Sequence, residues 1–244
     1  MVMALELSGE SKLSKLGYKF VDNKLLQNDD SPFKFLGQQH YEEVGDAVAT
    51  YIEELLIKEG LEAVDLSKFA NSTPGRLTEK PVIYSSPGVW AQDKQQQSEK
   101  SLILLIQGSG AVRAGQWARS LCINDSLCSG SQLNYIRRIK KMGWDVIVFN
   151  PNQPHTYQGP VSQRVVKNVE FVWERLQESK HQYKDIAIIA HSYGAHHTLN
   201  LLDNYPQVRE KVKGIAFTDG VYQKASKQNA EILKRIGMNW VTSA

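Results

Sequence analysis

A serine flanked by small residues is the first candidate for chemistry in this chain. With one residue between them, Ser192 follows Ile186-Ala-Ile-Ile-Ala, a short β-branched apolar run, and it precedes a helix-compatible stretch. The residues two before and two after it, Ala190 and Gly194, are small, as a tight turn between a strand and a helix requires. Ala190 stands where glycine is more usual. Such a turn strains the backbone and exposes the serine hydroxyl above a sheet, so Ser192 is the candidate nucleophile.

Attack by a serine on a carbonyl creates an oxyanion that backbone N–H groups must stabilise. The N–H of Tyr193, directly after the serine, is one candidate donor. A second set of candidate donors lies just after the apolar strand expected over residues 102–107. There Gly108, Ser109 and Gly110 form a glycine-rich loop. Glycine lets the backbone approach a substrate carbonyl closely. The alternative is a tight strand-to-helix turn that binds nothing.

The same loop also begins like a dinucleotide-binding fingerprint, G-x-G-x-x-G. Arg113 stands where the third glycine or alanine should be. No acidic residue follows at a strand end about twenty residues later, where the fingerprint needs one for the ribose. We therefore expect no nucleotide cofactor.

Asp219 is the candidate acid. It follows a strand expected over residues 214–218, the next strand after the one that carries the serine. A carboxylate there would orient a histidine and stabilise its imidazolium. The chain order serine, acid, histidine is that of α/β-hydrolases. The alternative is that Asp219 belongs to an ordinary Thr-Asp-Gly turn.

The base is missing from its expected place. None of the six histidines follows Asp219, although in this arrangement the histidine comes from a loop after the last strand. His191 should point away from the turn, and His196 should pack or cap within the helix. His155 follows a strand expected over residues 146–150, so it is the remaining candidate. We expect an incomplete triad and a fold truncated at its C-terminal end, which predicts slow acylation at best.

Apolar strands alternate with helices along most of the chain. This pattern predicts a mostly parallel sheet with helices on both faces and functional groups at the carboxyl ends of the strands. We expect one α/β-hydrolase-like domain over residues 41–244, preceded over residues 1–40 by an extended lead-in with room for short strands. The expected strands span residues 82–84, 102–107, 146–150, 186–190 and 214–218. The expected helices span residues 42–58, 114–121, 131–142, 162–178, 195–205 and 224–236.

Composition argues against several other classes. The 244 residues carry a net charge of +3, and the densest basic cluster, residues 137–141, has the spacing of a solvated helix face, so no direct nucleic-acid binding is expected. Cys122 and Cys128 are too few for a disulfide framework and lack a metal-binding spacing with histidines. No stretch approaches the length of a membrane span, and no signal peptide is visible. We expect no metal site and no cofactor.

Several of these segments together resemble a known family. The segments Ile106–Arg119, Val146–Asn152, Ala190–Gly194, Thr218-Asp219 and Asn239–Val241 closely resemble the Arb-two-type domain. That domain occurs in a subunit of the Argonaute siRNA chaperone complex and in metazoan cotranscriptional regulators. The resemblance implies an α/β-hydrolase-like fold with a serine nucleophile at Ser192. It also implies work in the nucleus or cytoplasm with Argonaute-type and chromatin or splicing proteins.

The chain departs from the regulators of that family in two places. Residues 153–163 are short where the regulators carry a long charged insertion. The regulators also continue past Asn-Trp-Val with a histidine-containing segment that this chain lacks, so their candidate base cannot be carried over.

Two functions remain open from the sequence. One is a serine hydrolase acting on an ester or thioester. The other is a hydrolase-derived interaction module in RNA silencing, cotranscriptional regulation or splicing regulation. Arg113, Trp117 and Arg119 carry the same ambiguity. Arg113 could bind an anionic substrate group beside the glycine loop, or both arginines could form ion pairs around a buried Trp117.

Overall fold

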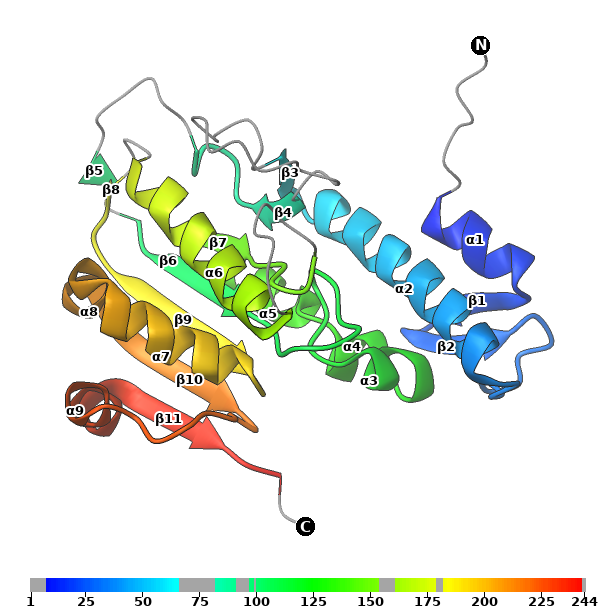
Figure 1. Ribbon diagram of the computed structural model, residues 1–244. Coiled ribbons are helices and arrows are strands. Elements are labelled where there is room, and N and C mark those ends of the chain that lie inside the picture. The colour runs from blue at the N-terminus through cyan, green and yellow to red at the C-terminus, as the bar shows by residue number, and fades with distance from the viewer. Residues whose placement is uncertain are drawn as a thin grey trace, which may run out of the picture.

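A seven-stranded sheet forms the centre of the molecule (Figure 1). The computed structural model describes residues 8–65, 82–90, 97–98, 100–153, 161–178 and 182–242. The strand order is β11-β10-β9-β6-β7-β4-β3. The strands are β3 (Glu62–Asp65), β4 (Val82–Ser85), β6 (Leu102–Ile106), β7 (Asp145–Val148), β9 (Ile186–His191), β10 (Val212–Thr218) and β11 (Gly237–Trp240).

Most of the sheet is parallel, as the sequence predicts. Strands β7, β6, β9, β10 and β11 run in one direction, whereas β4 pairs antiparallel with both β7 and β3. Ile106 pairs with Ala190, and Thr218 pairs with His191. The loops after β6, β9 and β10 therefore leave the sheet side by side at its carboxyl edge, which is where α/β folds place their functional groups.

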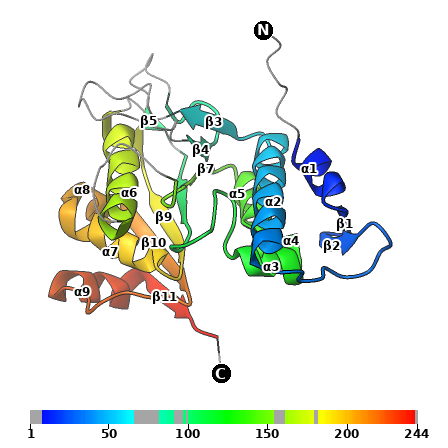
Figure 2. The ribbon, with the colours of Figure 1, turned by 45° about the vertical axis from the view of Figure 1, so that its right-hand side comes forward.

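Helices cover both faces of this sheet (Figure 2). One face carries α6 (Val161–Glu178), α7 (Gly194–Asn204), α8 (Pro206–Lys211) and α9 (Lys227–Ile236). The other carries α2 (Gln38–Lys58) and α5 (Leu133–Lys141). A short parallel pair, β5 (Gln97–Ser98) and β8 (Gln182–Tyr183), lies outside the main sheet. The chain therefore has an α/β-hydrolase-like fold with a mostly parallel central sheet.

The central strands are buried on both sides, which explains their continuous apolar sequence. In β6, Leu102, Leu104 and Ile106 pack into the core beneath α6 and α7. The alternate residues Ile103 and Leu105 pack into the second core, beneath α2 and α5. A strand with a polar face would leave one of these two helix layers without an apolar partner.

An N-terminal layer covers the far side of α2 from the sheet (Figure 2). It consists of α1 (Gly9–Lys15) and a hairpin of β1 (Tyr18–Val21) and β2 (Lys24–Gln27), next to α3 (Arg119–Asn124) and α4 (Leu127–Gly130). A third apolar cluster joins these elements to α2. The segment expected as an extended lead-in with room for short strands therefore contains a strand hairpin and also a helix, which was not expected.

Three further elements differ from the expectation. The helix expected over residues 114–121 begins only at Arg119, because Gly115 has a φ of +82° that a helix does not allow. Pro206 does more than end α7, since it also begins α8, at a position that proline favours. Strand β11 was not expected, because Gly237–Trp240 is short and contains glycine and asparagine, which are depleted in strands.

Candidate functional site

Ser192 lies at the apex of a tight turn between β9 and α7. Its φ of +51° falls in the left-handed region, which is rare for a residue with a side chain and stores strain. The Ser192 N–H donates to the carbonyl oxygen of Thr218 at 3.0 Å. The Ser192 carbonyl accepts from the N–H groups of Ala195 at 3.1 Å and Val221 at 2.9 Å. The segment after β10 therefore holds the strained serine from the neighbouring strand.

Two glycines make room for this turn. The Cα of Gly108 approaches so closely that an added Cβ would lie 3.0 Å from the Cβ and 3.3 Å from the Oγ of Ser192. An added Cβ at Gly194 would lie 2.3 Å from the carbonyl oxygen of Ile106. A side chain at either position would push the serine or the start of α7 away from β6. The structure thus brings the glycine loop directly against the serine hydroxyl.

Asn152, which follows β7, holds the glycine loop from the side. Its side-chain amide donates to the carbonyl oxygens of Gly108 at 2.9 Å and Val112 at 3.0 Å. Asn168 of α6 supports it by donating to the carbonyls of the residues before and after Asn152, at 2.8 Å each. The sequence reasoning assigned no role to either asparagine. The only signal was the Asn-Pro-Asn segment that follows an apolar strand.

Backbone N–H groups near Ser192 are available to an oxyanion. Within the described residues, no acceptor takes the N–H of Ser109 or of Tyr193. Tyr193 is the N-cap of α7, so the partial positive charge of that helix terminus lies next to the serine. Gly110 has a φ of +114°, which requires glycine in the loop. Donors of this kind stabilise the charge that develops in acyl transfer.

His191 lies at the end of β9, and β10 holds its ring. Its Nδ1 donates to the carbonyl oxygen of Thr218 at 2.9 Å and lies 3.1 Å from the Thr218 Oγ1. A proton on Nδ1 leaves Nε2 as an acceptor. The ring packs edge-on against Trp117, with centroids 6.3 Å apart, and both residues line the same pocket as Ser192. His191 was expected to point away from the site, and the structure puts it in the wall.

Asp219 directly follows β10, next to the turn that carries Ser192, but its carboxylate hydrogen-bonds to Thr242. It accepts from the N–H of Thr242 at 2.6 Å and from the hydroxyl of Thr242 at 2.8 Å. These two hydrogen bonds keep the pKa of Asp219 below its usual value. No histidine in the described part of the chain hydrogen-bonds to Asp219 or to the Ser192 hydroxyl. The described residues therefore bring the serine and the glycine loop together, and none of their histidines is hydrogen-bonded into a triad with Ser192 and Asp219.

The remaining histidines add no base to the described site. His155 and His181 lie outside the described residues. His40 packs in the N-terminal layer, and His196 hydrogen-bonds within α7. His197 is 1% exposed, and neither of its ring nitrogens has a partner among the described residues.

A pocket of about 320 Å³ opens at Ser192. Its volume is at the lower end of the range for small-molecule sites. Its walls come from helix α2, the loop after β6, the start of α3 and the end of β9. The side chains that line it include Tyr41, Ser109, Trp117, Arg119, His191 and Ser192.

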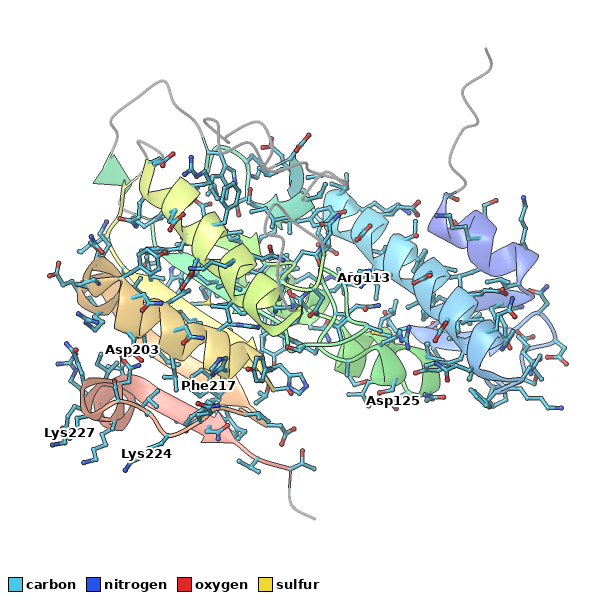
Figure 3. The ribbon with its side chains drawn as sticks, viewed as in Figure 1. Arg113, Asp125, Asp203, Phe217, Lys224 and Lys227 are labelled. Carbon is cyan, nitrogen blue, oxygen red and sulfur yellow. The ribbon has the colours of Figure 1, made fainter. Side chains whose placement is uncertain are left out.

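Of the two arginines singled out from the sequence, Arg119 lines this pocket and Arg113 does not. Arg113 lies beside α2 (Figure 3). Burial raises the pKa of Glu53 on α2, and the charge of Arg113 opposes that effect. The Arg119 Cζ lies 4.9 Å from the centroid of the Tyr41 ring. Trp117 is 8% exposed, so it is buried in the wall as the packing interpretation expected.

Comparison with known proteins settles the family. Residues 9–169 and 160–244 match the Arb2 domain. The chain belongs to the Arb2 domain family. This Arb2 chain is 35% identical over 228 residues to a FAM172 family protein homolog from Caenorhabditis elegans, covering 91% of the chain and 69% of the relative.

Two other relatives of this Arb2 chain are named cotranscriptional regulators. The Dictyostelium discoideum cotranscriptional regulator ARB2A homolog is 28% identical over 260 residues, covering 89% of the chain and 63% of the relative. The Homo sapiens cotranscriptional regulator ARB2A is 28% identical over 269 residues, covering 85% of the chain and 62% of the relative. The Arb2 chain thus spans about two thirds of the length of the relatives it matches.

A solved structure shares the fold of this Arb2 chain. It is that of a histone deacetylase from Saccharomyces cerevisiae, with a TM-score of 0.52 and 14% sequence identity. The match covers 84% of this chain and 82% of that one. At this identity the likeness concerns the fold alone.

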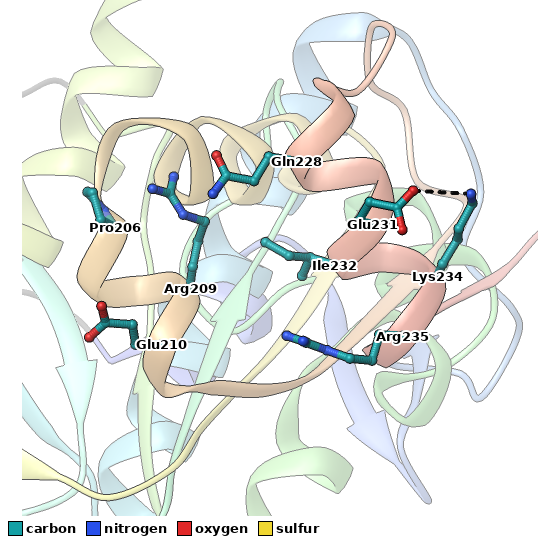
Figure 4. A pocket seen from close by; sticks show the side chains of 8 residues that line it. All are labelled: Pro206, Arg209, Glu210, Gln228, Glu231, Ile232, Lys234 and Arg235. Carbon is teal, nitrogen blue, oxygen red and sulfur yellow. Dashed lines mark hydrogen bonds and ion pairs between the residues drawn. The ribbon is translucent and has the colours of Figure 1, made fainter.

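The Arb2 chain has a second, wider hollow of about 830 Å³ between α8 and α9 (Figure 4). Its lining includes Arg209, Glu210, Lys234 and Arg235, and Glu231 pairs with Lys234 at 3.3 Å. Because α8 precedes β10 and α9 precedes β11, this hollow lies at the amino ends of the strands. We therefore place the candidate site at Ser192, at the opposite edge, where the strained serine lies.

The described part of this Arb2 chain lacks two kinds of feature. It contains no cluster of three or more His, Cys, Asp or Glu side chains arranged to hold a metal ion. It also contains no helix with the length and apolar character needed to span a membrane.

Proposed function

We propose that this chain acts in gene regulation as an Arb2 protein whose hydrolase-type pocket at Ser192 binds a small ligand. The names of its relatives, cotranscriptional regulators, support a regulatory role, and this role supports work in the nucleus. The single observation that carries the pocket's role is the close approach of Gly108 to the Ser192 side chain, because a strained serine beside N–H donors that no described acceptor takes is suited to binding a carbonyl group.

The described residues of this pocket do not favour fast hydrolysis of a bound ester. Ser192 has no histidine partner among the described residues, and the Asp219 carboxylate accepts from Thr242 instead of a histidine. A serine without a general base loses several powers of ten in acylation rate. We therefore expect the chain to label slowly or not at all with a fluorophosphonate probe.

A labelling experiment tests this proposal. Wild-type chain and the Ser192→Ala variant are incubated with the probe, and the extent of labelling is followed over time by mass spectrometry. Slow or absent labelling agrees with a binding pocket. Rapid labelling that Ser192→Ala abolishes would contradict it and establish a nucleophile.

An esterase or thioesterase is the second candidate function. It is favoured by His191, whose protonated Nδ1 is fixed on Thr218 and whose Nε2 is left as an acceptor in the wall of the Ser192 pocket. His155 is the alternative base from the sequence. If rapid labelling occurs, His191→Ala and His155→Ala variants identify which histidine supports it, because only loss of the working base slows acylation.

The partners we propose are Argonaute-type and chromatin or splicing proteins, in line with the family resemblance. Affinity capture with the tagged chain from nuclear extract, quantified against a tag-only control, tests this. Enrichment of an Argonaute protein supports an RNA-silencing role. Enrichment of splicing or chromatin proteins without Argonaute supports cotranscriptional work alone, and enrichment of neither contradicts the adaptor role.

A further inference from the structure

We propose that the Ser192 pocket takes a small ester or thioester that carries a carboxylate, and that the guanidinium of Arg119 binds this carboxylate. The inference rests on the proposal that the pocket holds a carbonyl compound, and it adds the charge of that compound. It starts from the position of Arg119, at the first residue of α3 and in the wall of the pocket.

Helix α2 is shaped to receive this arginine. The Arg119 guanidinium lies over the ring of Tyr41, and its Cδ, Nε and Nη1 lie against Gly45, one helical turn further along the same face. A Cβ added at Gly45 would lie 2.8 Å from the Arg119 Cδ and 3.2 Å from its Nη1. Glycine is disfavoured inside a helix, and Gly45 lies well inside the 21 residues of α2. Its presence is explained by the space that Arg119 occupies.

The aromatic side of this wall is also fixed. The Tyr41 ring packs against Phe33 at 6.1 Å and against Phe35 at 6.0 Å between centroids. An arginine stacked on an anchored ring keeps its planar donors in one orientation, which favours two-point binding of a carboxylate. The guanidinium is therefore presented in a defined direction.

The charge of Arg119 has no counterion in the described structure. No described carboxylate lies within ion-pair distance of its guanidinium, although Arg137 and Arg175 pair at 2.7 Å with Glu59 and Glu178. None of the described residues that line the pocket is acidic. A half-buried guanidinium in a pocket without acidic groups attracts an anion from solution, and a carboxylate matches its fork of donors.

The size of the pocket limits the ligand. Arg119 and Ser192 line one space of about 320 Å³, so the carboxylate and the carbonyl must belong to one small molecule. The carbonyl would lie against the N–H groups of Ser109 and Tyr193, and the carboxylate would lie at Arg119. A half-ester of a short dicarboxylic acid has these two groups at its two ends.

The experiment compares two probes that differ in one charge. Monomethyl glutarate and dimethyl glutarate are titrated into the full chain carrying Ser192→Ala, and binding is measured by calorimetry. We expect the monoester to bind at least about 10-fold more tightly than the neutral diester, since a charge-assisted pair of this kind contributes on that scale. Equal affinities, or no binding of either probe at millimolar concentration, would overturn the inference.

Variants then assign the preference to Arg119. Arg119→Met keeps the apolar stem and should remove the preference for the monoester. Gly45→Ala leaves the arginine in the chain but displaces it, so the preference should fall. Arg113→Met removes a neighbouring positive charge outside the pocket and should leave the preference intact. Thermal unfolding checks that each variant folds, and Arg119→Lys, which keeps charge without the fork, replaces Arg119→Met if that variant does not fold.

The binding preference for the monoester can be judged separately from acylation of Ser192. An Arg119-dependent preference in a chain that no fluorophosphonate labels would support the anion site and reject the hydrolase. Rapid labelling with no preference for the monoester would support the hydrolase and reject the anion site. A preference that survives in Arg119→Met would reject Arg119 as its cause.

Discussion

Asn152 donates its side-chain amide to the carbonyl oxygen of Gly108 at 2.9 Å, across the gap between the ends of β7 and β6. The same amide reaches Val112, so one side chain closes the whole loop that faces Ser192. The loop owes its position to this asparagine as much as to its own glycines.

Replacing Asn152 by alanine should loosen the glycine loop. Two hydrogen bonds are lost, and the two loop carbonyls lose their donor, so we expect the free energy of unfolding to fall by about 1–3 kcal/mol. Urea unfolding followed by circular dichroism measures this. Asn134→Ala is the control, because the Asn134 amide makes one long contact, at 3.5 Å to the Cys128 carbonyl. Equal effects of the two substitutions would show that Asn152 has no special role.

Gly194 and Gly214 offer a matched pair of glycine substitutions. A Cβ at Gly194 would lie 2.3 Å from the backbone oxygen of Ile106, whereas at Gly214 the nearest atom would be 3.9 Å away. We expect Gly194→Ala to cost about 3 kcal/mol or more, because backbone must move to admit the methyl group. Gly214→Ala should be neutral or slightly stabilising. Melting temperatures of the two variants measure the contrast, and similar values would argue against close packing of α7 on β6.

His197 should make the protein sensitive to acid. Burial lowers the pKa of His197 to about 3, with a smaller contribution from the neighbouring His196. An unfolded histidine titrates near pH ~6.5. The folded state therefore resists protonation, and stability that is present above pH ~6.5 is lost as the pH falls toward the folded pKa, with a slope of up to about 1.4 kcal/mol per pH unit.

The variant that tests this is His197→Phe, which keeps a ring without a titratable nitrogen. The free energy of unfolding of wild type and variant is measured at several pH values between neutral and mildly acidic. The slope in the variant should be smaller by the contribution of one proton. Parallel curves would mean that other groups cause the acid sensitivity.

The two cysteines should react very differently in the native protein. Cys128 is exposed, whereas Cys122 is buried, and burial raises the pKa of the Cys122 thiol to about 12. The thiolate is the reactive form, so we expect native protein to incorporate one iodoacetamide per chain and denatured protein two. Peptide mapping by mass spectrometry locates the label. Rapid native labelling of Cys122 would mean that the cluster joining α2, α3 and α4 opens readily.

Long apolar strands and amphipathic helices were readable from the sequence, because each signal is local. Strand β6 and helix α6 lie where periodicity predicted them. The elements that escaped prediction depend on tertiary contacts. Strand β11 has a weak local signal and forms because β10 offers it a parallel edge, and α1 is a seven-residue helix stabilised by packing on α2.

The site was likewise predictable only where the sequence signal is local. Small residues around Ser192 predict a tight turn, since only small residues fit there. Glycine directly after a strand predicts that the backbone approaches another group closely. Arg119 and Tyr41 gave no such signal, because their meeting depends on how α2 docks against the loop after β6. The orientation of Asp219 toward Thr242 likewise depends on the path of the chain after β11.

The walls of the Ser192 pocket come from distant parts of the sequence, with Tyr41 on α2 and Ser192 after β9. A chain still being synthesised on the ribosome has only the first of these until β9 emerges and pairs with β6. A molecule that needs both walls can therefore bind only after β9 has joined the sheet. By mass action such a molecule would stabilise the folded protein, and its effect would grow with its concentration.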